Sequence, residues 1–361
     1  MLKRKINITV PKLNKPGGVA SFYNAVLPHM DDKSYEINIL EIGSTTRFPN
    51  FLKYVIDQFR FNKTLTTSTE LVHINPSLGF KSFIRDGLFI MLAKRKGIPV
   101  LVFFHGWNQN FEQRIKKSLF WFFKMSFARA DAFIVLASTF ETFLRDSEIQ
   151  APIYIETTAI DENLINAFNI DNKIQALSSA KTFPILFLSR LEREKGAFET
   201  IDAVKLLINQ GLPVTLSIAG DGSILDELKD YAKQQLDNHV QFLGYVSGDE
   251  KVRVFSEHSV YCFPTNYGEG LPTSVLEAMA FGLPVVTRPV AGLADHFKDG
   301  LMGKLCHTMD PKEIAESIKF IINDPSITKI ARYNHEHAVN TFMASKVAER
   351  LSNIYQSTLK H

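Results

Sequence analysis

The chain has 361 residues, of which 45% are hydrophobic and 22% charged, so it is a globular protein long enough for two domains. A formal net charge of +3 gives no general case for nucleic-acid binding. The only cysteines, Cys262 and Cys306, lack a metal-type spacing and suggest a reducing compartment. No signal-peptide core opens the chain, and no apolar run reaches the roughly 18 residues of a spanning helix, so we expect a cytoplasmic protein.

The first half of the chain alternates short apolar segments with helix-like stretches. A helix is expected from about Gly18, and five segments are short, rich in β-branched or aromatic residues, and apolar on both faces: 5–10, 35–42, 71–75, 99–104 and 131–137. Strands that alternate with helices predict right-handed βαβ units and a parallel sheet.

The alternation breaks at 167–182, a polar stretch of weak periodicity that suits a linker. It restarts with strand-like segments at 183–189, 213–219, 239–243, 259–264 and 283–287, and the chain after about residue 300 has a helical pattern throughout. The sequence therefore predicts two doubly wound α/β domains in tandem. Ligands bind beyond the carboxyl ends of such strands, so two domains facing each other would form one deep cleft.

Two glutamates follow the predicted strand 259–264, in the stretch "NYGEGLPTSVLEAMAFGLPVVT". Glu269 lies on a glycine-rich loop, where an acid is more often functional than structural. Glu277 lies on a helix that Thr273 or Ser274 is expected to cap. For Glu277 alone we favour a capping box with Ser274, and the alternative is ligand binding at a helix N-terminus that favours anions.

Two cations follow the first strand of the second domain, in "LSRLEREKG". Arg190 and Lys195 lie at the strand end where a diphosphate would bind, and both are suited to it. A solvated charged loop is an equal alternative, because Glu192, Arg193 and Glu194 lie between them.

Three further sites in the sequence follow strands. Gly17 and Gly18 would let the backbone approach a ligand, but the pattern is neither G-x-G-x-x-G nor a Walker motif. The stretch "IAGDGS" at 218–223 is a similar glycine turn. His105 directly follows a buried strand and is better placed for a site than most lone histidines, whereas His73 lies inside a strand and is expected in the core.

Residues 114–128, "RIKKSLFWFFKMSFA", mix basic residues with a run of aromatic ones. The favoured interpretation is a helix with one face packed on the sheet and a basic face whose stems cover apolar surface. The alternative is a basic amphipathic helix on an anionic membrane.

Together, "GEGLPTSVLEAMAFGLPVV" and the earlier "LSRLEREKG" resemble the retaining GT-B glycosyltransferases often called family 4, the glycosyl transferases group 1. The resemblance extends over nearly the whole chain through "GGVASFYNAVL", "FFHGW", "RADAFIVLAS" and "FLGYVSGDEKVRVFSEHSVYCFPTNYGEG". It implies an α/β GT-B fold of two Rossmann-like, doubly wound parallel-sheet domains that face each other across a cleft. A C-terminal helix would cross back to the first domain.

We accordingly divide the chain into four parts. These are a first, acceptor-side domain at 1–168, a linker at 169–182, a second, sugar-nucleotide-binding domain at 183–340 and the crossing helix at 341–361.

The resemblance also implies roles for individual residues. Glu277 would bind the ribose hydroxyls, Glu269 would bind a hydroxyl of the donor sugar, and Glu269 and His105 would be the catalytic candidates near the transferred sugar. Arg190 and Lys195 would neutralise the diphosphate. Further donor contacts would come from Gly18, Gly270, Leu271 and Thr273 near sugar and phosphate, and from Gly244, Tyr245 and Val246 near the base.

One position departs from the family pattern. Thr158 stands where the family commonly has Asn, which puts the role of that loop in doubt. Pro272 has no N–H to donate to a phosphate.

The implied activity is transfer of a hexosyl or N-acetylhexosaminyl group, with retention, from a nucleotide-diphosphate sugar to a glycan, glycolipid or other hydroxyl acceptor, as in polysaccharide biosynthesis. We expect a UDP-sugar rather than a GDP-sugar and no cofactor. No convincing Asp-x-Asp metal motif is present, so Arg190, Lys195 and a helix N-terminus are expected to stabilise the leaving diphosphate without a metal.

The expected partners are the nucleotide sugar and a glycan or lipid-linked acceptor, with no nucleic acid. A lipid-linked acceptor would make peripheral contact of 114–128 with the inner membrane face relevant. Two alternatives stay open: a sugar-nucleotide epimerase or hydrolase on the same fold, and a non-catalytic partner that binds a sugar nucleotide. The second is disfavoured because every donor-site position is intact.

Overall fold

A computed structural model describes residues 3–15, 17–43, 50–268 and 270–360. The chain divides into two units. Unit 1 comprises Met1–Ala159, Gly268–Leu271 and Ala344–His361, and unit 2 comprises Ile160–Tyr267 and Pro272–Met343.

Unit 1 contains a sheet of six parallel strands in the order β2-β1-β3-β4-β5-β6. The strands are β1 Arg4–Val10, β2 Tyr35–Glu41, β3 Thr69–Ile74, β4 Val100–Phe104, β5 Ala132–Val135 and β6 Ile153–Ile155. All five residues of β4 are buried, as an apolar run inside a parallel sheet requires.

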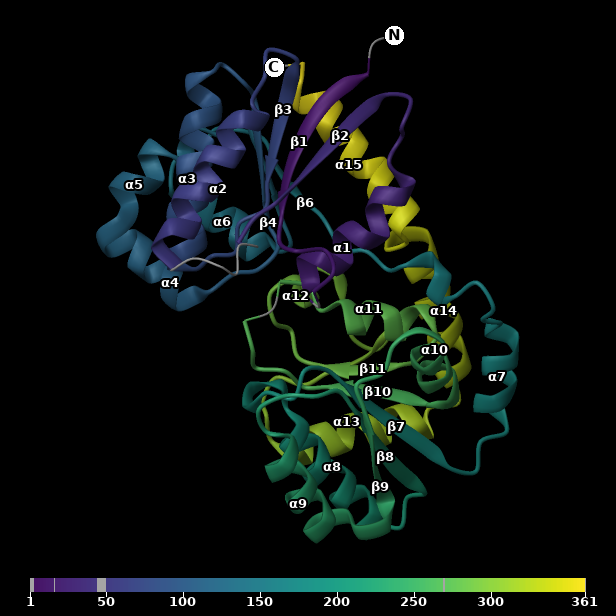
Figure 1. Cartoon of the computed structure of the whole chain (residues 1–361). Helices are drawn as coiled ribbons and strands as arrows, with labels where there is room; N and C mark the ends of the chain where they lie inside the picture. Colours follow the sequence, from purple (N-terminus) through teal and green to yellow (C-terminus); the bar gives the residue numbers. More distant parts are fainter. Residues whose placement is uncertain (1–2, 16, 44–49, 269, 361) are drawn as a thin grey trace. The chain divides into compact units, whose positions relative to one another are not determined.

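Helices cover both faces of this sheet. They are α1 Gly18–Val26, α2 Asn50–Thr64, α3 Phe80–Arg95, α4 Gln109–Arg114, α5 Phe120–Met125, α6 Ser138–Asp146 and α15 Ala344–Thr358, with short helical turns at Leu27–His29, Ile115–Leu119 and Phe127–Arg129. In Figure 1, α1 and α15 lie on one side of β1 and β2, and α2 and α3 lie on the other.

Unit 2 contains a second six-stranded parallel sheet in the order β12-β11-β10-β7-β8-β9. Its strands are β7 Phe183–Leu188, β8 Val214–Ala219, β9 Val240–Gly244, β10 Val260–Phe263, β11 Val285–Thr287 and β12 Gly303–Leu305.

The helices of unit 2 again cover both faces of its sheet. They are α7 Ile170–Ser178, α8 Ala197–Asn209, α9 Leu225–Leu236, α10 Gly248–Glu257, α11 Thr273–Ala280, α12 Gly292–His296, α13 Pro311–Asn323 and α14 Ile327–Thr341, with short turns at Glu162–Leu164, Arg193–Lys195 and Asp237–His239. Figure 1 shows α8, α9 and α13 on one face of this sheet and α10, α11 and α14 on the other.

The predicted strands and the doubly wound fold class are confirmed, but two strands of the structure were not predicted. Strands β6 and β12 have three residues each, too few for a periodicity signal.

The C-terminal helix α15 belongs to unit 1, as the fold class predicted. The Tyr35 hydroxyl donates to the carbonyl oxygen of Ser352 at 3.1 Å. Arg350 Nε donates to a carboxylate oxygen of Glu156 at 2.8 Å, and its Nη2 donates to the hydroxyl of Thr157 at 2.9 Å. These contacts join residues that lie far apart in the sequence. They hold the C-terminal helix against the first sheet.

The stretch 169–182, assigned to a linker from its polar composition, contains helix α7. Asn169 caps it by accepting from the backbone N–H of Asp171 at 2.8 Å. Lys173 is only 4% exposed, and its ammonium donates to the carbonyls of Ser256 (2.8 Å), Phe255 and His258 at the end of α10. Polar residues here serve as caps, which composition alone does not distinguish from a linker.

The first unit also ends earlier than 168. Residues from Ile160 onward group with unit 2, and the Ile160 N–H donates to the Phe342 carbonyl at 2.8 Å. This bond joins the start of unit 2 to the residue that follows α14 within the same unit.

Candidate functional site

The switch point of the second sheet lies between β7 and β10. The strand order there equals 6-5-4-1-2-3 in chain order, so connections leave β7 and β10 towards opposite sides. The loops that follow these two strands meet, because the N–H of Asn266 donates to the Glu194 carbonyl at 2.8 Å. Ligands of doubly wound sheets bind at this position, at the carboxyl ends of the strands.

Both predicted phosphate-binding cations lie on the loop after β7. Lys195 is only 6% exposed, and its ammonium lies 4.1 Å from the centre of the Tyr267 ring. Arg190 is exposed, and its guanidinium has no hydrogen-bond partner among the residues that the structure describes. Gly196, directly after Lys195, has φ +87°, and a Cβ there would lie 2.7 Å from the Pro264 carbonyl oxygen. Glycine thus lets the two loops approach closely.

Glu277 does not form the predicted capping box, and that expectation was wrong. Helix α11 begins at Thr273 after Pro272, so Ser274 lies inside the helix, where its hydroxyl is 2.8 Å from that of Tyr261. Glu277 is 6% exposed, and its Oε1 accepts from the ammonium of Lys251 at 2.6 Å. No hydrogen bond from a described residue reaches its other oxygen, Oε2. A buried carboxylate with one cation partner and one open oxygen is suited to a ligand hydroxyl pair.

The remaining donor-site predictions lie at the end of β9 and between β10 and the start of α11. Gly244, with φ +67°, is the last residue of β9, and the exposed Tyr245 and the buried Val246 follow it. Thr273 begins α11. Gly270 and Leu271 are buried residues of the β10–α11 loop and group with unit 1. Glu269 lies outside the described residues.

His105 and Gly18 belong to unit 1. His105 directly follows β4, and its ring packs on Phe103 with centroids 3.7 Å apart. Gly18 begins α1 after β1, and open space surrounds it. Both lie at the carboxyl edge of the first sheet, as predicted, while the other described candidates except Gly270 and Leu271 lie in unit 2.

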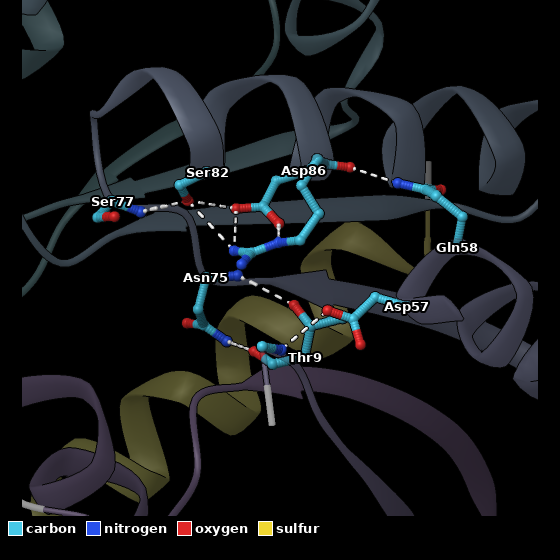
Figure 2. A network of polar contacts seen from close by, with 9 residues as sticks. Thr9, Asp57, Gln58, Asn75, Ser77, Ser82 and Asp86 are labelled. Atoms are coloured by element: carbon cyan, nitrogen blue, oxygen red, sulfur yellow. Dashed lines mark hydrogen bonds and ion pairs between the residues drawn. The ribbon is translucent and has the colours of Figure 1, made fainter. Parts of the chain in front are cut away.

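The hydrogen bonds around Asn75 determine which nitrogen of His105 carries the proton. Asn75 Nδ2 donates to the Thr9 carbonyl at 2.9 Å, so its Oδ1 faces the opposite way (Figure 2). That oxygen accepts from the Tyr23 hydroxyl at 2.8 Å and lies 2.9 Å from His105 Nε2. An amide oxygen only accepts, so Nε2 of His105 is protonated and Nδ1 of the neutral ring keeps its lone pair.

Burial keeps this cluster uncharged. Desolvation, with a smaller effect of His73, lowers the pKa of His105 well below its ordinary value. Desolvation also lowers the pKa of His73 to about 3. His73 is fully buried, as expected of a core residue, and its Nδ1 lies 2.8 Å from the Tyr355 hydroxyl on α15. Nε2 of His73 lies 3.4 Å from the Tyr23 hydroxyl, so the C-terminal helix contacts the same chain of polar groups as His105.

Sequence reasoning missed Asn75 and Lys251. Asn75 directly follows β3 in the same way that His105 follows β4, so its position at a strand end was an available signal. Lys251 lies on α10, far from Glu277 in the sequence, and no local pattern connects the two.

Residues 114–128 divide between core and surface. Phe122 is 7% exposed and Phe123 is fully buried, which supports the favoured packing interpretation, whereas Trp121 is 62% and Met125 49% exposed. Lys116 forms an ion pair with Glu112 at 2.9 Å. Among the described helices, none is long and apolar enough to cross a membrane.

Comparison with known proteins identifies unit 2. Residues 169–338 match the family described as Glycosyl transferases group 1. This part of the chain carries the domain of that family. The resemblance drawn from the acidic motif and from "LSRLEREKG" is thereby confirmed, and the chain is a glycosyltransferase.

Two relatives illustrate how far the similarity extends. The glycosyltransferase is 30% identical to the capsular polysaccharide biosynthesis glycosyltransferase CapM of Staphylococcus aureus, over 182 residues that make up 49% of this chain and 47% of CapM. It is 25% identical to the uncharacterized glycosyltransferase MJ1069 of Methanocaldococcus jannaschii, over 90% of this chain and 86% of that protein. The alignment thus spans about half of CapM but most of MJ1069.

Solved structures confirm the fold class. HepE of Anabaena, solved in complex with UDP and glucose, is 18% identical and has a TM-score of 0.74, with 98% of this chain and all of HepE covered. At this identity the likeness establishes the GT-B fold alone.

Proposed function

We propose that this glycosyltransferase transfers a sugar from a nucleotide-diphosphate sugar, with a UDP-sugar as donor, to a hydroxyl acceptor. The observation that carries the proposal is the grouping of Arg190, Lys195 and the Lys251-paired Glu277 around the switch point of unit 2. Cations suit the diphosphate, and the open oxygen of Glu277 suits the ribose hydroxyls. HepE, which was also solved with UDP-glucose, supports the choice of base.

The chemistry follows from what each group offers. Negative charge develops on the diphosphate as it leaves, and a partly desolvated ammonium at Lys195 stabilises that charge more than it would in water. We propose retention by attack of the acceptor on the face from which the phosphate departs, with the phosphate taking the acceptor proton. The neutral His105 would then accept a hydrogen bond at Nδ1 near the sugar without carrying charge.

We propose that the acceptor is a glycan or a lipid-linked glycan. CapM, which acts in capsular polysaccharide biosynthesis by its name, supports the first. The exposed Trp121 and Met125 beside Lys117 support contact with an anionic membrane surface through residues 114–128.

The experiment that tests the activity compares donor turnover with and without an acceptor extract. We expect UDP release that depends on the acceptor and sugar incorporated into it. Equal donor loss without acceptor would favour a hydrolase or epimerase, and binding without turnover would favour a non-catalytic partner. A thermal-shift series with UDP, GDP and ADP identifies the base, since a nucleotide at 100 times its Kd stabilises by about 2.7 kcal/mol.

A further inference from the structure

Unit 1 has its own switch point, and a cavity lies there. The strand order β2-β1-β3-β4-β5-β6 reverses direction between β1 and β3. A cavity of about 600 Å³ is lined by residues that follow these two strands and by the start of α3, among them Asn75, Ser77, Phe80, Lys81, Ser82 and Arg85. We call it the β1/β3 cavity. Its volume is in the range of small-molecule sites.

The charged groups that line the β1/β3 cavity are both cations. Lys81 is exposed, and its ammonium has no hydrogen-bond or ion-pair partner among the described residues. The side chain of Arg85 is 15% exposed, and Arg85 is the second lining cation. The acids nearest to Arg85 are Asp86 and Asp57, which are each at most 1% exposed and do not line the cavity.

A hydrogen-bond network holds Arg85 in place. Asp86 accepts from Arg85 Nε at 2.7 Å and from Nη2 at 2.9 Å, and from the Ser82 hydroxyl at 2.6 Å. The Ser82 hydroxyl in turn accepts from the N–H of Ser77 at 3.1 Å, and Figure 2 shows these residues in one connected group. The third guanidinium nitrogen, Nη1, forms no hydrogen bond to a described residue. The guanidinium is therefore fixed with a donor to spare.

Two other features of the cavity fit a small organic anion. Phe80, which is 47% exposed, and the apolar Val19 supply surface for the non-polar part of a ligand. Helix α3 begins at Phe80 without a side-chain cap, so its positive end adds to the field of the two cations.

We propose that the β1/β3 cavity binds an anionic group, a phosphate or a carboxylate, carried by the hydroxylated acceptor. The assignment as acceptor rests on the proposed function, whereas anion binding does not. Asn75 connects the cavity with the proposed transfer site, because it lines the cavity and its Oδ1 accepts a hydrogen bond from Nε2 of His105. An acceptor in the cavity thus lies beside the residue expected near the transferred sugar.

The test measures probe binding by titration calorimetry at constant ionic strength, with UDP saturating the cations of unit 2. The probes are glucose 6-phosphate, glucuronate and neutral glucose. We expect saturable binding of at least one anion, at least about tenfold tighter than glucose, because charge-assisted hydrogen bonds are the stronger ones. The two anions distinguish phosphate from carboxylate. Equal affinity for charged and neutral probes, or no saturable binding of either anion, overturns the proposal.

Variants localise the binding. Lys81→Gln removes an exposed charge without disturbing the Arg85–Asp86 pair, and we expect the anion Kd to rise about tenfold or more. Lys33→Gln makes the same charge change on an exposed lysine of unit 1 outside the cavity and is expected to leave the Kd within about twofold. Anion binding that survives Lys81→Gln unchanged sinks the assignment. If UDP does not bind, the proposed function fails, and the comparison of Lys81→Gln with Lys33→Gln still tests the cavity.

Discussion

Glu277→Gln tests the central assignment of the donor site. The structure removes the interpretation in which this residue only caps a helix, because Ser274 lies inside α11 and Glu277 instead binds Lys251. Glutamine has nearly the same shape and still accepts from Lys251, so the substitution chiefly removes the negative charge. The free energy of unfolding is therefore expected to change by about 1 kcal/mol or less.

The expected loss of nucleotide affinity follows from the open oxygen. Oε1 is occupied by Lys251, which leaves Oε2 with two lone pairs for the ribose hydroxyls. A hydrogen bond to a charged group contributes about 1.5–3 kcal/mol and a neutral one about 0.5–1.5 kcal/mol. One or two such bonds give a difference of about 1–3 kcal/mol, so the UDP Kd should rise about 5- to 150-fold.

The assay is titration calorimetry with UDP, run beside thermal unfolding. Glu250→Gln is the matched control, since it makes the same charge change on α10 at a side chain that is 51% exposed. The control should bind UDP as the unsubstituted protein does. A folded Glu277→Gln protein with unchanged UDP affinity would refute the ribose assignment.

Four further predictions test the remaining parts of the argument. Lys195→Ala should lower kcat/KM for the donor about 10- to 150-fold in steady-state kinetics, because it removes a charge-assisted hydrogen bond to the diphosphate. Unchanged kinetics would mean that the loop after β7 is only a solvated charged loop. Turnover should survive EDTA, because Arg190 and Lys195 are expected to neutralise the phosphates, and loss of turnover that magnesium restores would contradict this. Acidification should destabilise unit 1 from about pH 6.5 downward, because the unfolded chain protonates His73 near its ordinary pKa of 6.5, whereas burial lowers the pKa of His73 in the folded protein to about 3. The expected loss in the free energy of unfolding is about 2 kcal/mol at pH 5. Denaturant titrations of the protein and of His73→Phe at pH 7 and pH 5 measure this loss, and an equal pH response in both proteins would contradict the prediction. The protein should pellet with anionic vesicles at low salt, and less of it should pellet as the salt concentration rises. Lys117→Glu should weaken this binding, whereas Lys33→Glu should retain it. If no protein pellets at low salt, the exposed Trp121 has no membrane role.

The sequence predicted the elements whose signal is local. Ten strands were predicted because a buried parallel strand requires an apolar run, and the segment that became β4 is buried at all five positions. The same logic failed for β6 and β12, where three residues are too few to show a pattern. It also failed at α7, where Asn169 and Lys173 serve as caps and polarity was taken for a linker.

The placement of candidate residues at strand ends could be predicted, since a residue that follows a strand lies at the carboxyl edge wherever the strand lies in the sheet. His105, Arg190 and Lys195 were found in this way. Asn75 satisfied the same rule and was overlooked.

Partners across the fold were decided only by the tertiary structure. Lys251 reaches Glu277, Tyr355 reaches His73, and the β1/β3 cavity forms because strand order places Asn75 and Arg85 beside the loop after β1. A hydrogen bond or a cavity wall depends on which strands are neighbours and on their register. Local periodicity specifies that a segment is a strand or a helix, and it carries no information about which distant segment will pack against it.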